Sequence, residues 1–343
     1  MRIALDATYS IDSHPTGIAV YSRELIAGLS RIYVEDEFFP CYRPKQFRHS
    51  TRILSPNAHR RLLLPPLPTF RAEVFHALNQ RVDRRQAKRV LSTFHDLFVI
   101  TSEYSSPEFR ARFAEQARRA AAHSDFIIAV SQFTANQVHD LLGVERSRIQ
   151  VIPHGVHEAP TEATGGREKI ILCVGALQIR KNVARLVEAF ESAPQDWILV
   201  LAGSASGYGA VEILGRIDHS RCRDRIRITG YVTERELQRL YSRASIFAFP
   251  SLAEGFGIPV LEAMAHGVPV VTSKGSALEE VAGDAALLVD PEQADEIAGA
   301  LALLIQDEDL RATLEGRGRA RAAMYTWERS VRSTHGVYEE LMK

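Results

Sequence analysis

The chain has 343 residues with equal numbers of acidic and basic side chains, so its formal net charge is zero. Such a balance argues against binding nucleic acid through bulk electrostatic attraction. With 45% apolar and 24% charged residues, the composition is that of a folded protein, and the length predicts two domains. Cys41, Cys173 and Cys222 form no CxxC pair, which indicates a reducing compartment and no metal knuckle.

The first segment predicts a strand, a glycine turn and a helix. Residues 2–7 have the pattern of a buried strand, and apolar spacing predicts a helix over residues 19–30. Gly17 lies between them, where it either lets the backbone approach a ligand or serves only the turn. The opening MRIALDATYS contains an acid and is no secretory signal, and no apolar run approaches the ~18 residues of a membrane span. We therefore expect a cytoplasmic protein.

The region from residue 43 to residue 89 is basic, with twelve lysines and arginines against two acids. Within it, residues 60–68 (RRLLLPPLP) place an apolar, proline-interrupted run beside two arginines. This run is either a surface loop whose leucines pack on the domain or a patch that contacts an anionic membrane surface. Because proline breaks a long amphipathic helix, we favour the surface loop and keep peripheral membrane contact as the alternative. The basic residues could equally meet an anionic substrate.

Two further buried strands are predicted at residues 73–76 and 89–94, and the second leads into His95. Doubly wound sheets bind ligands beyond the carboxyl ends of their strands, so His95 is a candidate site residue. The alternative is a histidine satisfied by neighbouring backbone. The first α/β half continues with predicted strands and helices at residues 107–123, 125–130, 132–142 and 148–153. The aperiodic residues 158–168 predict a linker.

A second α/β half begins with a predicted strand at residues 169–174. Arg180 and Lys181 follow at a strand-to-helix junction, before a helix predicted over residues 183–190. A guanidinium binds phosphate in bidentate fashion, an ammonium adds a compact charge, and a helix start offers N–H groups. Because positive charge is unfavourable at a helix start, this pair predicts a bound diphosphate rather than two solvated cations.

The remaining elements complete the second half. They are predicted at residues 197–202, 225–229, 234–242, 244–249, 270–272, 278–281, 287–289, 292–305, 310–325 and 326–342. The D-x-D sequence at residues 307–309 lies at the start of a terminal helix rather than after an apolar strand. We therefore interpret it as a solvated helix cap and not as a metal site.

The most informative stretch is FPSLAEGFGIPVLEAMAHGVPVV, which begins at Phe249. A strand, a glycine-containing loop and a helix with proline in its first turn present backbone N–H groups to an anion. Glu254 and Glu262 add two carboxylates, which can accept hydrogen bonds from the paired hydroxyls of a ribose or hexose. The alternative is a loop carboxylate and a solvated helix residue. Glu262 lies among small apolar residues, so we expect it to have a partner or to face a cleft.

Together these segments resemble the retaining glycosyltransferases of glycosyltransferase family 4 (group 1), with ALQIRKN and FGIPVLEAM most similar to mannosyltransferases. The resemblance covers nearly the whole chain. It implies an α/β GT-B fold, in which two doubly wound Rossmann-like domains face a cleft and a C-terminal helix crosses back to the first domain. The acceptor-side domain would comprise residues 1–157 with 326–343, and the nucleotide-sugar-binding domain residues 158–325. The chain departs from the family pattern at its single Gly17 and at residues 154–157 (HGVH), where N-G-V-D is common.

The resemblance also implies roles for individual residues. His95 would lie near the transferred sugar, Glu254 would contact that sugar, and Arg180 and Lys181 would stabilise the leaving diphosphate. These four are the predicted catalytic residues. The predicted donor-binding residues, of which Glu262 would hold the ribose hydroxyls, are Gly17, Gly203, Ser204, Tyr231, Val232, Gly255, Phe256, Gly257, Leu261 and Glu262. No metal ligand and no cofactor is expected, because the two cations make a divalent ion unnecessary.

We therefore expect a retaining, metal-independent hexosyltransferase of polysaccharide biosynthesis. GDP-mannose is the favoured donor, and the acceptor is a saccharide or lipid-linked saccharide. A UDP-sugar-dependent enzyme of the same fold and a catalytically silent sugar-nucleotide-binding module are the alternatives. A nicotinamide-dependent oxidoreductase would need G-x-G-x-x-G after the first strand and an acid roughly 20 residues further on, and we discount this class because residues 2–17 offer neither feature. No nucleic acid partner is expected.

Overall fold

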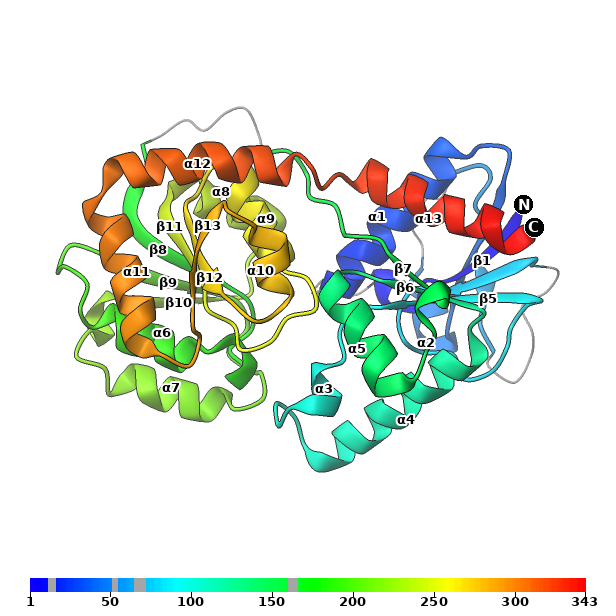
Figure 1. Ribbon diagram of the computed structural model, residues 1–343, viewed down its shortest axis with the longest axis horizontal. Helices are drawn as coiled ribbons and strands as arrows, with labels where there is room; N and C mark the ends of the chain where they lie inside the picture. Colours follow the sequence, from blue (N-terminus) through cyan, green and yellow to red (C-terminus); the bar gives the residue numbers. More distant parts are fainter. Residues whose placement is uncertain (12–16, 51–54, 65–71, 160–165) are drawn as a thin grey trace. The chain divides into compact units, whose positions relative to one another are not determined.

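The computed structural model describes residues 1–11, 17–50, 55–64, 72–159 and 166–343 (Figure 1). The chain forms two compact units. Unit 1 comprises Met1–Gly155 and Thr326–Lys343, and unit 2 comprises Val156–Tyr325. The division falls two residues before the boundary that the sequence analysis placed after residue 157. In the described part of the chain, no helix is both long and apolar enough to cross a bilayer.

Unit 1 is built on a seven-stranded parallel sheet with the order β3-β2-β1-β4-β5-β6-β7. Its strands are β1 (Arg2–Asp6), β2 (Glu37–Tyr42), β3 (Arg61–Leu62), β4 (Val74–Ala77), β5 (Arg89–Phe94), β6 (Phe126–Ala129) and β7 (Ile149–Val151). Its α-helices are α1 (Gly17–Ile32), α2 (Pro44–Phe47), α3 (Phe98–Thr101), α4 (Pro107–His123), α5 (Gln132–Leu142) and α13 (Trp327–Met342). Short 3-10 turns are η1 (Thr8–Ile11) and η2 (Arg146–Arg148).

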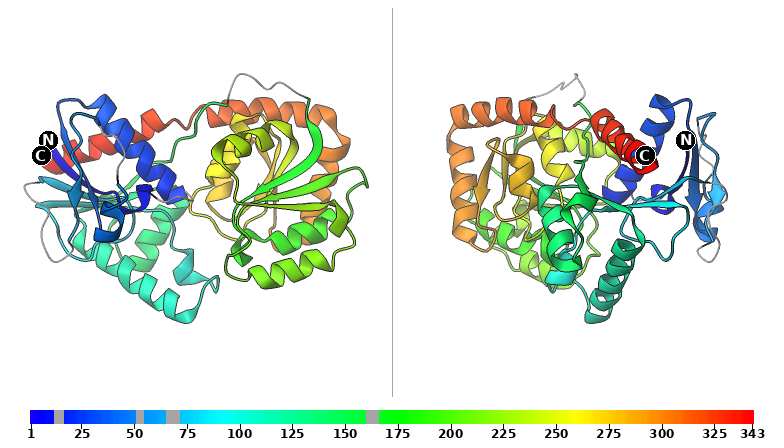
Figure 2. Two further views of the ribbon diagram at one scale, coloured as in Figure 1. Left: turned by 180° about the vertical axis from the view of Figure 1, so that it is seen from behind. Right: turned by 45° about the vertical axis from the view of Figure 1, so that its right-hand side comes forward.

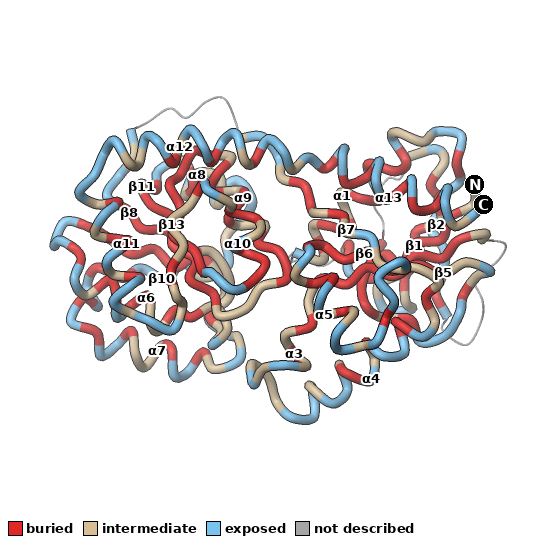
Figure 3. Tube along the Cα trace, in the orientation of Figure 1, coloured by how far each residue is buried: buried red, intermediate tan, exposed pale blue. Residues whose placement is uncertain are grey.

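Side chains that alternate along the strands give unit 1 two cores, one on each face of its sheet. Ile3 and Leu5 of β1 belong to the core beneath α1 and α13, two helices that pack together (Figure 2). Ala4, between them in sequence, belongs to the opposite core with Phe75 and Ala117. Figure 3 accordingly shows the central strands of this sheet mostly as buried.

Unit 2 is built on a six-stranded parallel sheet with the order β10-β9-β8-β11-β12-β13. Its strands are β8 (Glu168–Val174), β9 (Ile198–Ala202), β10 (Ile226–Gly230), β11 (Ala244–Phe249), β12 (Val270–Ser273) and β13 (Ala286–Val289). Its α-helices are α6 (Val183–Phe190), α7 (Ala210–Asp218), α8 (Glu234–Arg243), α9 (Ile258–Ala265), α10 (Ala277–Ala282), α11 (Ala294–Gln306) and α12 (Glu308–Ala322). The 3-10 turns are η3 (Ile179–Lys181) and η4 (Arg223–Arg225).

Local signals explain the helix ends that the sequence predicted. Ser131 accepts a hydrogen bond from the Thr134 amide at the start of α5, and Gly143 ends the helix in the left-handed conformation. Asp307 caps α12 by accepting from the Leu310 amide at 2.8 Å, which confirms the interpretation of the D-x-D sequence as a cap.

Two predictions need correction. Helix α1 begins at Gly17, so this residue belongs to the first helical turn and not to a turn before the helix. Helix α7 was not predicted, because it is short and follows a Gly- and Ser-rich loop.

Of the apolar run at residues 60–68, only residues 60–64 lie within the described part. There Leu63 is buried while Leu62 and Leu64 are exposed.

Candidate functional site

The loops after β8 and β11 are fastened together where these neighbouring strands end. Asn182 follows η3 in the left-handed conformation, with φ at 57°, which an asparagine tolerates better than most residues. Its buried Nδ2 donates to the carbonyls of Pro250 and Pro291, at 2.9 and 2.6 Å. Asn182 therefore fixes the turn that carries Arg180 and Lys181 against the loop after β11.

Arg180 and Lys181 converge on one oxygen of Glu254. The Oε1 atom lies 2.6 Å from Arg180 Nη1 and 2.7 Å from Lys181 Nζ. All three side chains are at most 14% exposed, and Lys181 Nζ also lies 4.5 Å from the centre of the Phe249 ring. The two cations lie in η3, before α6, and their carboxylate partner is part of the protein. The charge at this junction therefore does not by itself require a bound anion, contrary to the sequence argument.

The charges of the cluster stabilise one another. Burial would raise the pKa of Glu254, but the Arg180 and Lys181 charges lower it to about 2. Burial lowers the pKa of Lys181, and the Glu254 carboxylate opposes this shift. Two cations stand side by side here in a largely buried setting, and Arg180 also donates to the Ala253 carbonyl at 2.8 Å. Paired cations in such a setting are suited to binding a diphosphate, because charge-assisted hydrogen bonds are strong where water is scarce.

Glu262 has a protein partner on another helix. The Tyr241 hydroxyl, from α8, donates to Glu262 Oε2 at 2.9 Å. Burial raises the pKa of Glu262, and the hydrogen bond from Tyr241 opposes this shift. The prediction that this carboxylate has a partner is thus confirmed. Tyr241 was not named from the sequence, because the α8–α9 pairing brings together residues 21 positions apart.

Two glycines of unit 2 adopt backbone conformations or contacts that a side chain would hinder, one at a strand end and one at a helix start. Gly203, after β9, has φ at 156°, and a Cβ there would lie 2.1 Å from the carbonyl oxygen of Gly175. The carbonyl of the next residue, Ser204, accepts a hydrogen bond from the Leu177 amide at 2.8 Å. Gly257 precedes α9 with φ at 124°, a conformation that other residues rarely adopt. These three predicted residues shape the loops beside the Arg180–Lys181–Glu254 cluster.

The other predicted donor-binding residues differ in exposure. Tyr231 is 46% exposed after β10, and Val232 is half-buried. Gly255 and Phe256 are buried, and the Phe256 ring packs edge-on against Tyr325 at 5.9 Å between centroids. The Leu261 side chain is fully buried, so it belongs to the core of unit 2.

His95 lies in unit 1 with both ring nitrogens engaged. Its Nε2 donates to the Leu78 carbonyl at 2.9 Å, which leaves Nδ1 to accept from His154 Nε2 at 3.3 Å. Burial lowers the pKa of His95 to about 4, so the ring is neutral near pH 7. Tyr21 packs edge-on against it. The geometry is that of a satisfied histidine, and its contact with a sugar stays a prediction. Sequence reasoning did not name its partner His154.

Comparison with known proteins identifies the family. The sequence profile described as "Glycosyl transferases group 1" matches residues 158–321, and that of "Glycosyltransferase Family 4" matches residues 15–159. The O-antigen chain mannosyltransferase B of Escherichia coli is 31% identical over 291 residues, which cover 80% of this chain and 76% of that protein. The chain belongs to the group 1, family 4 glycosyltransferases.

A further relative and two solved structures agree with this assignment. The D-inositol 3-phosphate glycosyltransferase of Xylanimonas cellulosilytica is 32% identical over 69% of this chain and 62% of its own length. Sucrose-phosphate synthase from Thermosynechococcus elongatus superposes over 100% of this chain and 99% of its own, with a TM-score of 0.82 and 21% identity. Anabaena HepE, solved with UDP-glucose, covers 99% of this chain and 100% of its own, with a TM-score of 0.76 and 18% identity. The fold is therefore GT-B.

Proposed function

We propose that this glycosyltransferase moves mannose from GDP-mannose to a saccharide or lipid-linked saccharide, with retention of the anomeric configuration and without a metal ion. The Arg180–Lys181–Glu254 cluster is the observation that carries the proposal. It gathers two cations and one carboxylate at the carboxyl ends of β8 and β11, where doubly wound sheets bind ligands. The mannosyltransferase relatives favour mannose as the transferred hexose.

The cluster fits the charge changes of glycosyl transfer. The acceptor hydroxyl forms a bond to the anomeric carbon, the C–O bond to the diphosphate breaks, and the hydroxyl proton leaves with the nucleoside diphosphate. Negative charge grows on the diphosphate, and Arg180 and Lys181 would stabilise it. Glu254 would accept hydrogen bonds from the transferred sugar, and Glu262, held by Tyr241, would accept them from the ribose. The enzyme would work in the cytoplasm. Peripheral contact with the cytoplasmic face of the membrane is the alternative location.

The first test is calorimetric binding of GDP, UDP and ADP, with and without EDTA. We expect GDP to bind most tightly and EDTA to have no effect. Arg180→Ala should weaken GDP binding at least tenfold, because it removes one of the two cations that would bind the diphosphate. Lys169→Ala is the matched control, since Lys169 is an exposed unit 2 cation paired with Asp196. Equal GDP affinity of both variants would contradict the diphosphate role, and binding of no nucleotide would contradict the donor site itself. Nucleotide binding without transfer to any acceptor or to water would favour the catalytically silent sugar-nucleotide-binding module.

A UDP-sugar donor remains the second candidate, because a structural neighbour was solved with UDP-glucose. Preference for UDP in the same experiment would replace GDP-mannose and keep the transferase. The anomeric configuration of the product, read from its proton NMR couplings, tests retention separately.

A further inference from the structure

The buried amide of Asn79, in unit 1, belongs neither to the Arg180–Lys181–Glu254 cluster nor to the hydrogen bonds of His95. Asn79 lies two residues beyond the carboxyl end of β4 and is only 4% exposed. Neither its Nδ2 nor its Oδ1 has a hydrogen-bond partner among the residues that the structure describes. The Oε1 atom of the neighbouring Gln80, which is 7% exposed, also lacks one there. Buried amides without partners destabilise a fold, so two adjacent ones need an explanation.

The start of the loop that carries Asn79 is fixed in place. The carbonyl of Leu78 accepts the hydrogen bond from His95 Nε2 at 2.9 Å. The carbonyl of Gln80 accepts one from Gln116 Nε2, on α4, at 3.3 Å. The backbone is thus bonded on both sides of Asn79, while the Asn79 side chain is not.

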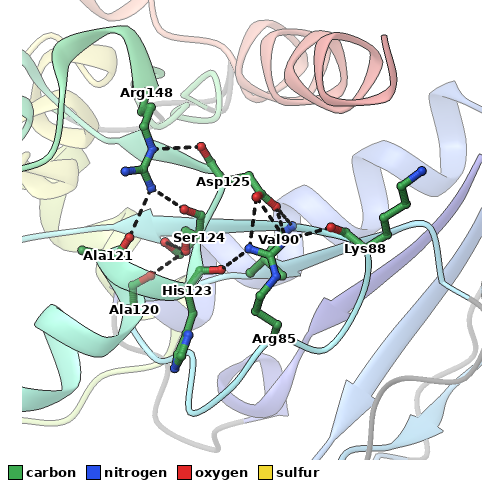
Figure 4. Close-up of polar contacts among 10 residues, drawn as sticks. Arg85, Lys88, Val90, Ala120, Ala121, His123, Ser124, Asp125 and Arg148 are labelled. Atoms are coloured by element: carbon green, nitrogen blue, oxygen red, sulfur yellow. Dashed lines mark hydrogen bonds and ion pairs between the residues drawn. The ribbon is translucent and has the colours of Figure 1, made fainter.

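Arg85 anchors the far end of the same loop (Figure 4). Its Nη2 lies 2.7 Å from one Asp125 oxygen and 3.0 Å from the other. Arg85 also donates from Nη1 to the carbonyl of His123, at 3.0 Å, and from Nη2 to that of Lys88, at 2.8 Å. Arg148 donates to the Asp125 carbonyl at 3.2 Å from the other side. The missing partners of Asn79 therefore do not result from an unanchored loop.

We propose that the Asn79 amide binds hydroxyl groups of the saccharide acceptor. An amide both donates and accepts, so it can bind two neighbouring sugar hydroxyls at once. The carboxyl ends of β4 and the adjacent β5 are the edge of the sheet where a ligand is expected, and the Leu78–His95 bond joins them there. The inference rests on the proposed function, since it takes the ligand to be a saccharide. It names the acceptor-binding residue in unit 1 that the sequence analysis lacked.

The test is Asn79→Leu, which keeps the size of the side chain and removes its polar atoms. Because the amide has no protein partner to lose, we expect the melting temperature to stay the same or to rise. With methyl α-D-mannopyranoside as the acceptor probe and GDP-mannose as donor, we expect KM for the probe to rise at least tenfold. Hydrolysis of GDP-mannose without acceptor should change less than twofold.

Asn57→Leu is the matched control. Asn57 Nδ2 donates to the carbonyls of Tyr33 and Asp36, each at 3.1 Å, so the same substitution there removes two hydrogen bonds. We expect a lower melting temperature and an unchanged KM for the probe. The opposite responses of the two variants would separate a ligand-binding amide from a structural one.

Two results would overturn the proposal. Asn79→Leu could lower the melting temperature as Asn57→Leu does and leave KM unchanged, which would indicate a structural water. Alternatively, saturation-transfer NMR could show that the probe binds neither the parent protein nor the variant, or binds both equally. Failure of the proposed function looks different, since the parent protein would then neither transfer nor hydrolyse any nucleotide sugar.

Discussion

Glu254 shares a single oxygen between two cations, and this geometry gives the residue two roles. Its negative charge offsets the charges of the two cations, and its shared oxygen holds these cations side by side. Removing only its charge separates these roles. The Glu254 carboxylate stays ionised to low pH, because its pKa is about 2, so the substitution changes a charge that is present under all ordinary conditions.

Glu254→Gln tests this at the residue scale. The amide keeps the shape but no longer offsets Arg180 and Lys181, so we expect the affinity for free GDP to stay equal or rise a few-fold. Turnover should fall at least tenfold, since a neutral amide binds the sugar hydroxyls more weakly than a carboxylate. Calorimetry and initial rates measure the two effects. A loss of GDP affinity as large as the loss of turnover would show that Glu254 supports the nucleotide and not the sugar.

At the scale of elements, the backbones at the ends of β8 and β9 lie so close together that a side chain on Gly203 would collide with Gly175. The Gly175 amide donates to the Ala202 carbonyl at 2.8 Å, and Gly203 passes directly beside Gly175. The loop after β8, with Arg180 and Lys181 on it, rests on this contact. The strand end at Gly203 therefore shapes the proposed donor site without a side chain of its own.

Gly203→Ala should accordingly destabilise unit 2 by about 2 kcal/mol or more, because its Cβ would collide with backbone and not with a movable side chain. Gly316→Ala is the control. Gly316 lies within α12, and a Cβ added there would meet no neighbouring atom within 4 Å, so alanine should stabilise by roughly 0.5–1 kcal/mol. Chemical denaturation measures both. If Gly203→Ala left the free energy of unfolding unchanged, the two loops would be able to move apart at little energetic cost.

Sequence reasoning reached the elements with strong local signals and failed where partners are distant in the chain. The helices predicted at residues 107–123, 132–142 and 183–190 match the observed bounds of α4, α5 and α6, and Ser131 and Gly143 mark the two ends of α5. The charges of Arg180, Lys181 and Glu254 were equally visible in the sequence. No local pattern shows, however, that both cations bind one oxygen of a carboxylate more than 70 positions further along the chain. Asn79 carries no signal at all in sequence, since only burial reveals that its amide has no partner.

At the scale of the whole molecule, burial lowers the pKa of three histidines in the described part of unit 1, so that they are neutral near pH 7. Burial lowers the pKa of His76 to about 3 and that of His95 to about 4, and it lowers that of His154 well below 6.5. Their unfolded counterparts take up protons near pH 6.5. Between pH 6.5 and 4 the unfolded state therefore binds more protons than the folded state, and stability falls as the pH is lowered.

Each histidine should contribute about 1.4 kcal/mol per pH unit, or about 4 kcal/mol per unit for all three. Trp197 lies in unit 2 and Trp327 in unit 1, so a Trp197→Phe protein reports on unit 1 alone by fluorescence. Urea unfolding of this protein from pH 7.5 to 5 measures the slope. His154→Gln should reduce this slope by about a third. A free energy of unfolding that does not change with pH would contradict neutral, buried histidines.

The discontinuous make-up of unit 1 has a consequence for protein synthesis. Helix α13 packs on α1, and its Tyr338 hydroxyl bonds to His76 Nδ1 at 2.7 Å, although 262 residues separate the two. On the ribosome, α1 and the first sheet emerge long before α13, and all of unit 2 is made in between. The unit made first is therefore completed last, and until then its incomplete core exposes apolar surface of the kind that favours aggregation.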